Sequence, residues 1–184
     1  NFTDAAYVLN NVGISCPVVF NVRDTIYGEQ IKIYDVQGSS SVNTITFNGE
    51  SGDSSVAGLN YQTINTADDF TLGLVGTHNI FFNDLTIART NGTYAMVVQG
   101  GVHNLTVVNS KLQGNVMSPS YSNDSTLNFT GNYVSGNISL TQALSSGSIF
   151  IEDNIISSDI FVEKSPLLSI RNNNISGETN LSQC

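Results

Sequence analysis

Acidic side chains are the first candidates for chemistry in this sequence, because clustered carboxylates can bind calcium or act as acid and base. The adjacent pair Asp68 and Asp69 lies outside the repeated pattern described below and is a candidate metal site, with a solvated loop as the alternative. Asp84 and Asp153 occupy a place where other repeats carry asparagine or glycine. We therefore expect these two aspartates to form turns.

Basic side chains are scarce, which limits the reactions that the chain could catalyse. The sequence contains six lysine and arginine residues, and none lies beside acidic residues on the same face of an expected strand. Calcium-assisted lyases need such a base next to acidic ligands, and glycoside hydrolases need paired carboxylates. We therefore predict no catalytic residues, no cofactor and no enzyme activity.

The two histidines stand in the same local context, His78 before Asn79 and His103 before Asn104. If these positions are equivalent in successive repeats, the two rings stack about 4.8 Å apart and could share a cation or a proton. Structural zinc normally takes four ligands, and no carboxylate or thiol accompanies the pair. We expect stacking at a corner, with a metal site as the alternative.

A repeated phrase positions these residues: apolar, any, apolar, any, then Asn, Asp or Gly, with another apolar residue at the eighth place. Each copy is followed by a second short apolar segment, and the spacing of roughly 20 to 25 residues is typical of a solenoid. Arg171 falls one repeat after Glu152 at the matching place, which predicts an ion pair between repeats. The five copies begin at Ile80, Leu105, Leu127, Ile149 and Leu168.

This pattern predicts an all-β fold, a single-stranded parallel β-helix in which each coil pairs with the coils above and below. An antiparallel β-sandwich is the alternative, but it does not require the same phrase in every strand. The turn residues are those that tolerate left-handed backbone. The apolar positions of the phrase should form a buried core ladder of Leu105, Val107, Leu127, Phe129, Ile149, Ile151, Leu168 and Ile170.

The amino-terminal part is less regular. Residues 3–12 have a capping Thr3 or Asp4 and a helical spacing of Ala5, Val8, Leu9 and Val12, with Gly13 as the stop. This segment predicts a short helix that covers the open end of the first coil. We expect one domain over residues 1–184: a capping helix at 1–13, irregular first coils at 17–76 and regular repeats at 77–184.

The run from Cys16 to Ser55 resembles a known family in its phrases PVVFNV, YGEQI and NTITFNGESGD. It is similar to the opening coils of right-handed parallel β-helix regions in large secreted or surface proteins of Bacteroidota, within the pectate-lyase-like superfamily. The resemblance covers roughly residues 5–56 and implies a right-handed helix and an exported protein, but no reaction. We expect the chain to depart from that family in having neither the long continuation nor the carboxy-terminal secretion domain.

The charge and hydropathy of the sequence limit the kinds of molecule that the protein could bind. The 184 residues carry a formal net charge of −9 with only 11% charged residues, which disfavours nucleic acid and anionic membranes and tolerates cations or glycans. No apolar run approaches the roughly 20 residues needed to span a bilayer, so we expect no membrane insertion. An extracellular or cell-surface location is the expectation.

Two functional classes remain. The first is a non-enzymatic structural protein, a subunit of a head-to-tail fibre or a segment of a surface stalk or adhesin, whose partner is a second copy. The second is a carbohydrate-binding or polysaccharide-degrading module with an open groove along one sheet. Several coils separate Cys16 from Cys184, too far for an internal disulfide. Cys184 could bond Cys16 of the next copy, and two unrelated thiols are the alternative.

Overall fold

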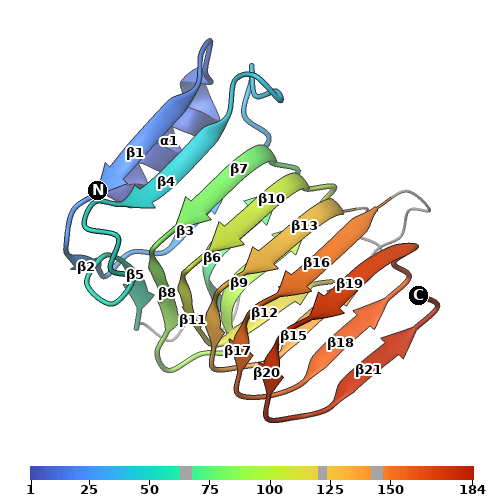
Figure 1. Cartoon of the computed structure of the whole chain (residues 1–184). Helices are drawn as coiled ribbons and strands as arrows, with labels where there is room; N and C mark the ends of the chain where they lie inside the picture. The colour runs from blue at the N-terminus through green and yellow to red at the C-terminus, as the bar shows by residue number, and fades with distance from the viewer. Residues whose placement is uncertain (63–67, 120–123, 142–146) are drawn as a thin grey trace.

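The computed structural model describes residues 1–62, 68–119, 124–141 and 147–184 and shows a parallel β-helix (Figure 1). Three seven-stranded parallel sheets run along the axis, and each coil contributes one short strand to each sheet. We name them sheets A, B and C in the order in which the chain visits them. This arrangement confirms the fold class predicted from the repeats, and it excludes the antiparallel sandwich.

The strands of each sheet recur at every third position in the chain. Sheet A contains β1 (Val18–Val22), β4 (Ile45–Gly49), β7 (His78–Asn83), β10 (His103–Val108), β13 (Ser125–Thr130), β16 (Ser148–Glu152) and β19 (Leu167–Arg171). Sheet B contains β2 (Ile26–Tyr27), β5 (Gly58–Tyr61), β8 (Thr86–Arg89), β11 (Lys111–Gln113), β14 (Tyr133–Val134), β17 (Ile155–Ile156) and β20 (Asn174–Ile175). Sheet C contains β3 (Ile31–Ile33), β6 (Phe70–Val75), β9 (Tyr94–Gln99), β12 (Asn115–Ser118), β15 (Ile138–Thr141), β18 (Ile160–Glu163) and β21 (Thr179–Ser182).

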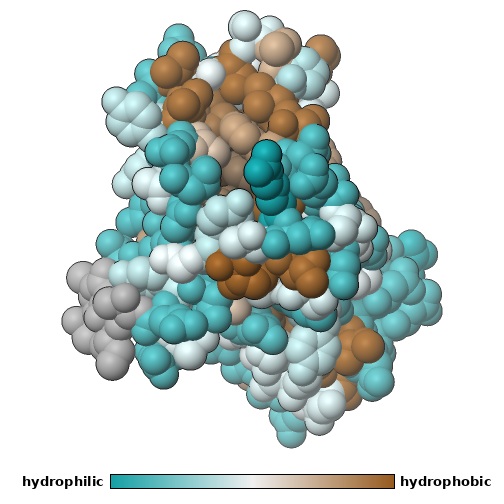
Figure 2. Space-filling model, turned by 90° about the vertical axis from the view of Figure 1, so that its left-hand side faces the viewer, coloured by the Kyte–Doolittle hydropathy of each residue, from teal (hydrophilic) through white to brown (hydrophobic). Residues whose placement is uncertain are grey.

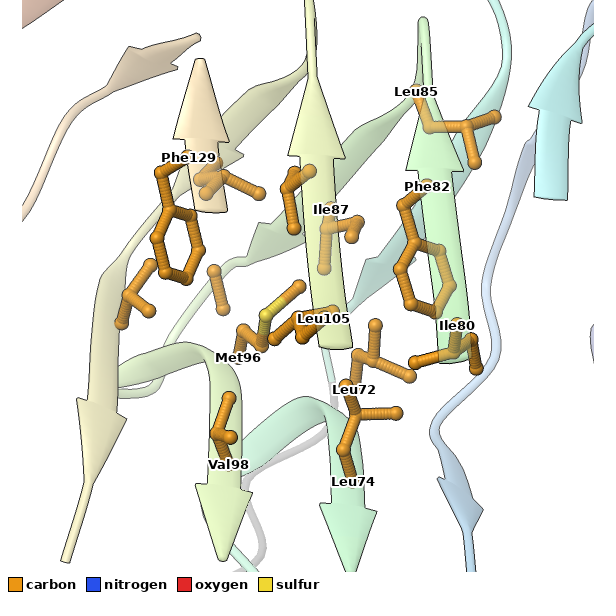
Figure 3. Packing of buried hydrophobic residues seen from close by; sticks show 14 of the residues in the cluster. Leu72, Leu74, Ile80, Phe82, Leu85, Ile87, Met96, Val98, Leu105 and Phe129 are labelled. Carbon is orange, nitrogen blue, oxygen red and sulfur yellow. The ribbon is translucent and has the colours of Figure 1, made fainter. Parts of the chain in front are cut away.

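The interior is filled by apolar side chains stacked in register. Leu105 pairs with Leu127 and then Ile149, while Val107 pairs with Phe129 and then Ile151, and all six are fully buried. Leu168 and Ile170 continue both columns and are partly buried. Figure 3 shows Phe82 and Phe129 pointing inward from sheet A toward the side chains of sheet C. Because strands alternate their side chains, every second residue of the phrase reaches this core.

The corner between sheets A and B has left-handed backbone, as predicted from its residue types. The first corner residue has a φ between 48° and 68° in each of five successive coils. Asparagine, aspartate and glycine tolerate this conformation better than other residues, which explains why they recur there. The five residues are Asp84, Asn109, Gly131, Asp153 and Asn172.

The helix α1 (Phe2–Val12) confirms the predicted helix, begins one residue earlier and buries only part of the predicted apolar face. Its N-cap is Asn1, whose side chain accepts a hydrogen bond from the backbone N–H of Asp4, so neither Thr3 nor Asp4 caps it. The buried residues are Phe2, Ala6 and Leu9, whereas Val8 and Val12 are exposed. The ring of Phe2 stacks on Phe47 at 5.6 Å, and this contact turns the helix away from the valine face.

The helix covers the sheet C side of the first coil. Asn10 donates from its side-chain amide to the backbone O of Lys32 (2.9 Å) and accepts from the N–H of Tyr34 (2.9 Å). One amide side chain therefore pairs with a donor and an acceptor at the β3 edge, as a neighbouring strand would. No helix among the described residues is long and apolar enough to cross a membrane.

Candidate functional site

A shallow groove lies on the outer face of sheet C. Its volume is about 300 Å³, and its floor includes Lys32, Gly73, Val97 and Met117, which are register partners in β3, β6, β9 and β12. The remaining lining residues come from the same strands and from the segment before β6; they are Asp68, Asp69, Phe70, Tyr94 and Gln99. Because stacked coils place equivalent residues in columns, the groove brings together residues distant in sequence.

Phe70 and Lys32 form the wall of this groove at its amino-terminal end. The Lys32 ammonium lies 5.1 Å from the centre of the Phe70 ring and 3.2 Å from the Asp68 carboxylate. A Cβ at Gly73 would lie 2.9 Å from the Phe70 ring, so the absence of a side chain there lets the ring lie against the sheet. The lysine thus meets an aromatic face and a carboxylate together, as cations commonly do.

The neighbouring Asp69 is held by a buried arginine. The Arg89 side chain is fully buried, and its Nε donates to Asp69 at 3.0 Å while Nη1 donates to the backbone O of Tyr61. The Tyr61 ring lies 4.9 Å from the guanidinium carbon. Asp69 also accepts from the backbone N–H of Thr93, and the pair closes against Gly92, where a Cβ would come within 2.2 Å of both partners. Asp69 therefore anchors the corner between sheets B and C.

The two candidate metal ligands, Asp68 and Asp69, therefore each face a cation of the chain. Burial opposes ionisation of Asp69, but the hydrogen bonds from Thr93 and Arg89 outweigh it and lower the pKa of this carboxyl. Among the described residues, no group of three or more His, Cys, Asp or Glu side chains is arranged to hold a metal ion. Asp69 thus holds Arg89 and the backbone of Thr93, and Asp68 pairs with Lys32 in the groove wall.

The predicted ion pair between Glu152 and Arg171 is confirmed. The two residues are register partners in β16 and β19, and Arg171 Nη2 lies 2.9 Å from Glu152 Oε2. Hydrogen bonds from Arg171 and from the Ser169 hydroxyl lower the pKa of the Glu152 carboxyl. The pair lies on the outer face of sheet A, away from the groove, and links two coils.

The histidines also occupy equivalent places, at the first residues of β7 and β10. Their ring centres are 4.9 Å apart with an angle of 61° between the planes, so they meet edge to face rather than in a parallel stack. His103 contacts the Ser125 hydroxyl through Nδ1, and His78 Nδ1 lies 3.9 Å from the Asp35 carboxylate. This corner lies between sheets C and A.

Asparagine side chains form a ladder of hydrogen bonds inside the solenoid, which we did not predict from the sequence. The second residue of each corner between sheets A and B points inward, where Asn132, Asn154 and Asn173 donate through Nδ2 to the backbone oxygens of Val107, Phe129 and Ile151. Each Oδ1 accepts from the backbone N–H of the equivalent residue one coil earlier. The signal was present, because polar residues follow the turn residue in four successive repeats: Ser110, Asn132, Asn154 and Asn173.

The cysteines are both free and exposed. Cys16 lies two residues before β1, the first strand of sheet A, and Cys184 lies two residues after β21, the last strand of sheet C. Both therefore occupy the corner between sheets C and A, at opposite ends of the seven coils. Six steps of about 4.8 Å separate these coils, on the order of 30 Å.

Comparison with known proteins adds no relative: no family model, no curated protein and no solved structure matches this chain. The parallel β-helix is therefore established by the strand pairing alone, and the family resemblance and a bacterial source remain expectations.

Proposed function

We propose that this chain is a non-enzymatic extracellular structural protein, a subunit of a head-to-tail fibre or a segment of a surface stalk or adhesin. The observation that carries the proposal is the continuous stacking of its seven coils, in which apolar columns and the asparagine ladder run from coil to coil. A regular solenoid of this kind is a rigid spacer whose length increases with each added coil. The family resemblance to bacterial secreted β-helix proteins supports an exported location.

The use of charge in the molecule supports the same proposal. Lys32, Arg89 and Arg171 each pair with a carboxylate of a neighbouring segment, namely Asp68, Asp69 and Glu152. A catalytic acid or base must exchange protons with a substrate, whereas these carboxylates are engaged by cations of the chain itself. These groups are well suited to fasten coils and corners together.

Both ends of the solenoid offer apolar surface for a head-to-tail contact. At the amino-terminal end, a groove of about 310 Å³ between α1 and β1 is lined in part by Phe2, Val19 and Phe20. Figure 2 shows apolar surface gathered at this end, at the top of the view. In the last coil, Leu167 and Leu181 are exposed. Because Asn10 covers the β3 edge, the contact we propose joins β19 of one copy to β1 of the next.

The cysteines give a direct test of that joint. Under oxidation by a small-molecule disulfide, Cys184 of one copy and Cys16 of the next lose two protons and two electrons, and the reagent is reduced to two thiols. We expect non-reducing gel electrophoresis of the 19.7 kDa chain to show a ladder of oligomers that reductant collapses to the monomer. The ladder should be absent in Cys184→Ser and in Cys16→Ser.

Electron microscopy under reducing conditions separates the contact from the covalent bond. Filaments of the reduced protein together with a monomer band on both gels would rule out the disulfide and leave the fibre proposal intact. Monodisperse particles one solenoid long at high concentration, in both oxidised and reduced protein, would contradict the fibre and leave a stalk segment as the structural role.

The groove on sheet C supports a second candidate function, a carbohydrate-binding module. Tyr94 offers an aromatic side chain, and Lys32, Asp68 and Gln99 offer hydrogen-bonding groups near it. Sugar rings present both apolar faces and hydroxyl groups, which this combination suits. The groove is open along the outer face of the sheet, so an extended chain could lie across several coils.

We expect no turnover of acidic polysaccharides such as pectin and alginate, with or without calcium, because the groove carboxylates are held in ion pairs. The measurement is release of reducing ends and of unsaturated products. Release that disappears in Asp69→Asn would contradict this prediction. Binding without turnover, weakened at least tenfold in Tyr94→Ala and unchanged in Tyr133→Ala on sheet B, would favour the carbohydrate-binding function instead of the structural one.

A further inference from the structure

The two histidines sit at a corner that the backbone holds tightly. Asn79 and Asn104, which follow them, both have left-handed backbone with φ of 54° and 55°, and Asn104 Nδ2 donates to Asn79 Oδ1 at 2.9 Å. The backbone N–H of His103 donates to the O of Thr77 at 3.0 Å. These bonds fix the two coils in register, so His78 and His103 cannot move apart without breaking them.

Two carboxylates face this histidine pair, and they are placed very differently. Asp35, after β3, lies 3.9 Å from His78 and is largely exposed, so water screens its charge. Asp124, before β13, is fully buried and attracts a proton on His103. Asp124 is already engaged, because it accepts from the backbone N–H groups of Gly101 and Val102.

The hydrogen bonds of Asp124 hold the turn that precedes His103. Its Oδ1 lies 3.2 Å and 2.8 Å from the two backbone nitrogens, and its Oδ2 accepts from the Ser118 hydroxyl at 2.7 Å. The turn itself contains Gly100 and Gly101 with φ of 74° and 87°, a conformation that glycine adopts at little cost. A turn built on two glycines is thus held by a buried carboxylate next to an imidazole.

We propose that the His78–His103 pair is an acid-sensitive latch, which keeps the turn at residues 100–102 closed when both rings are neutral and releases it when both are protonated. Two imidazolium rings with centres 4.9 Å apart repel each other. The attraction of the charged His103 ring to Asp124 opposes this repulsion but is the smallest of the three influences on His103. The burial of the His103 ring and the repulsion from His78 act in the same direction and disfavour the doubly charged pair.

The sign of the pH dependence follows from burial. Burial of the ring, and then the proximity of His78, lower the pKa of His103, while Asp124 opposes the shift. The folded state therefore favours neutral His103, and this contribution is fully present above the ordinary histidine value of about 6.5. It is lost as the pH falls below that value, so the latch should loosen on the acid side of about pH 6.5.

Hydrogen exchange of individual amides in the native protein tests the latch. After correction for intrinsic exchange, we expect the protection of Val102 and His103 to be lower at pH 5.5 than at pH 7.5. The amides of Ile149 and Ile151 in β16 serve as the control within the same molecule and should keep their protection. In His103→Gln the fall at the turn should disappear.

Two results would overturn the proposal. One is an equal loss of protection at the turn in the parent chain and in His103→Gln, and the other is a uniform loss over all coils. Should His103→Gln not fold, His78→Gln replaces it, with the His103 ring titrated by NMR. Removing the neighbouring ring should raise the His103 pKa, and an unchanged or lower value would also reject the latch.

Discussion

Replacing Phe129 with alanine should lower the free energy of unfolding by about 3 to 5 kcal/mol, the range for large-to-small substitutions in cores. Phe129 is fully buried and stacked between Val107 and Ile151 of the neighbouring coils. Removing the ring would therefore leave a cavity between these two side chains. The measurement is urea unfolding monitored by circular dichroism. The dependence of the unfolding free energy on urea concentration is compared between variants.

Phe150→Ala is the matched control for this substitution. Phe150 lies one coil further along sheet A, but its ring points outward and is 37% exposed. We expect its loss to cost about 1 kcal/mol, as for partly exposed positions. Equal costs for the two phenylalanines would mean that the ring at 129 does not fill a closely packed interior.

Asn154→Ala should also be strongly destabilising, at a cost on the order of 3 kcal/mol. The Asn154 side chain accepts from the backbone N–H of Asn132 at 2.8 Å and donates to the backbone O of Phe129 at 2.9 Å. Alanine would leave both buried backbone groups without these partners, and such groups cost about 1 to 3 kcal/mol each. Urea unfolding again provides the measurement.

Asn128→Ala supplies the comparison for the ladder. Its side chain lies on the outer face of sheet A, where Oδ1 accepts from the Thr130 hydroxyl and water can replace that bond. The expected cost is within about 0.5 kcal/mol, as at other surface positions. If Asn154→Ala were as mild as Asn128→Ala, the interior amide ladder would contribute little to stability.

The fold could be predicted because its strongest constraints are local and repeated. The alternation of apolar residues along each strand predicted the buried face. The asparagine, aspartate or glycine that recurs at the position of Asp153 predicted a left-handed corner. The same reasoning placed Glu152 beside Arg171 because equal positions in a phrase become neighbours when coils stack. Each of these inferences needed only the period and the chemistry of single residues.

The groove and the helix face depend on contacts that the period does not encode. The groove joins Lys32, Asp68 and Tyr94, which belong to different coils, and the first two lie in the irregular part of the chain. In α1, the predicted apolar face included Val8 and Val12, which are exposed, whereas Phe2 stacks on Phe47 and is buried. Tertiary packing of one large ring outweighed a pattern of smaller side chains.

The corners between sheets A and B have a consequence for how this chain can change in length. From β7 onward, each of these corners consists of two residues: Asp84–Leu85, Asn109–Ser110, Gly131–Asn132, Asp153–Asn154 and Asn172–Asn173. The connections from sheet C to sheet A differ widely, from Gly76–Thr77 between β6 and β7 to residues 34–44 between β3 and β4. One edge of the solenoid is thus fixed by left-handed backbone and inward amides, and the other accepts insertions. New loops, whether introduced by evolution or by protein engineering, would be displayed in a row along that second edge.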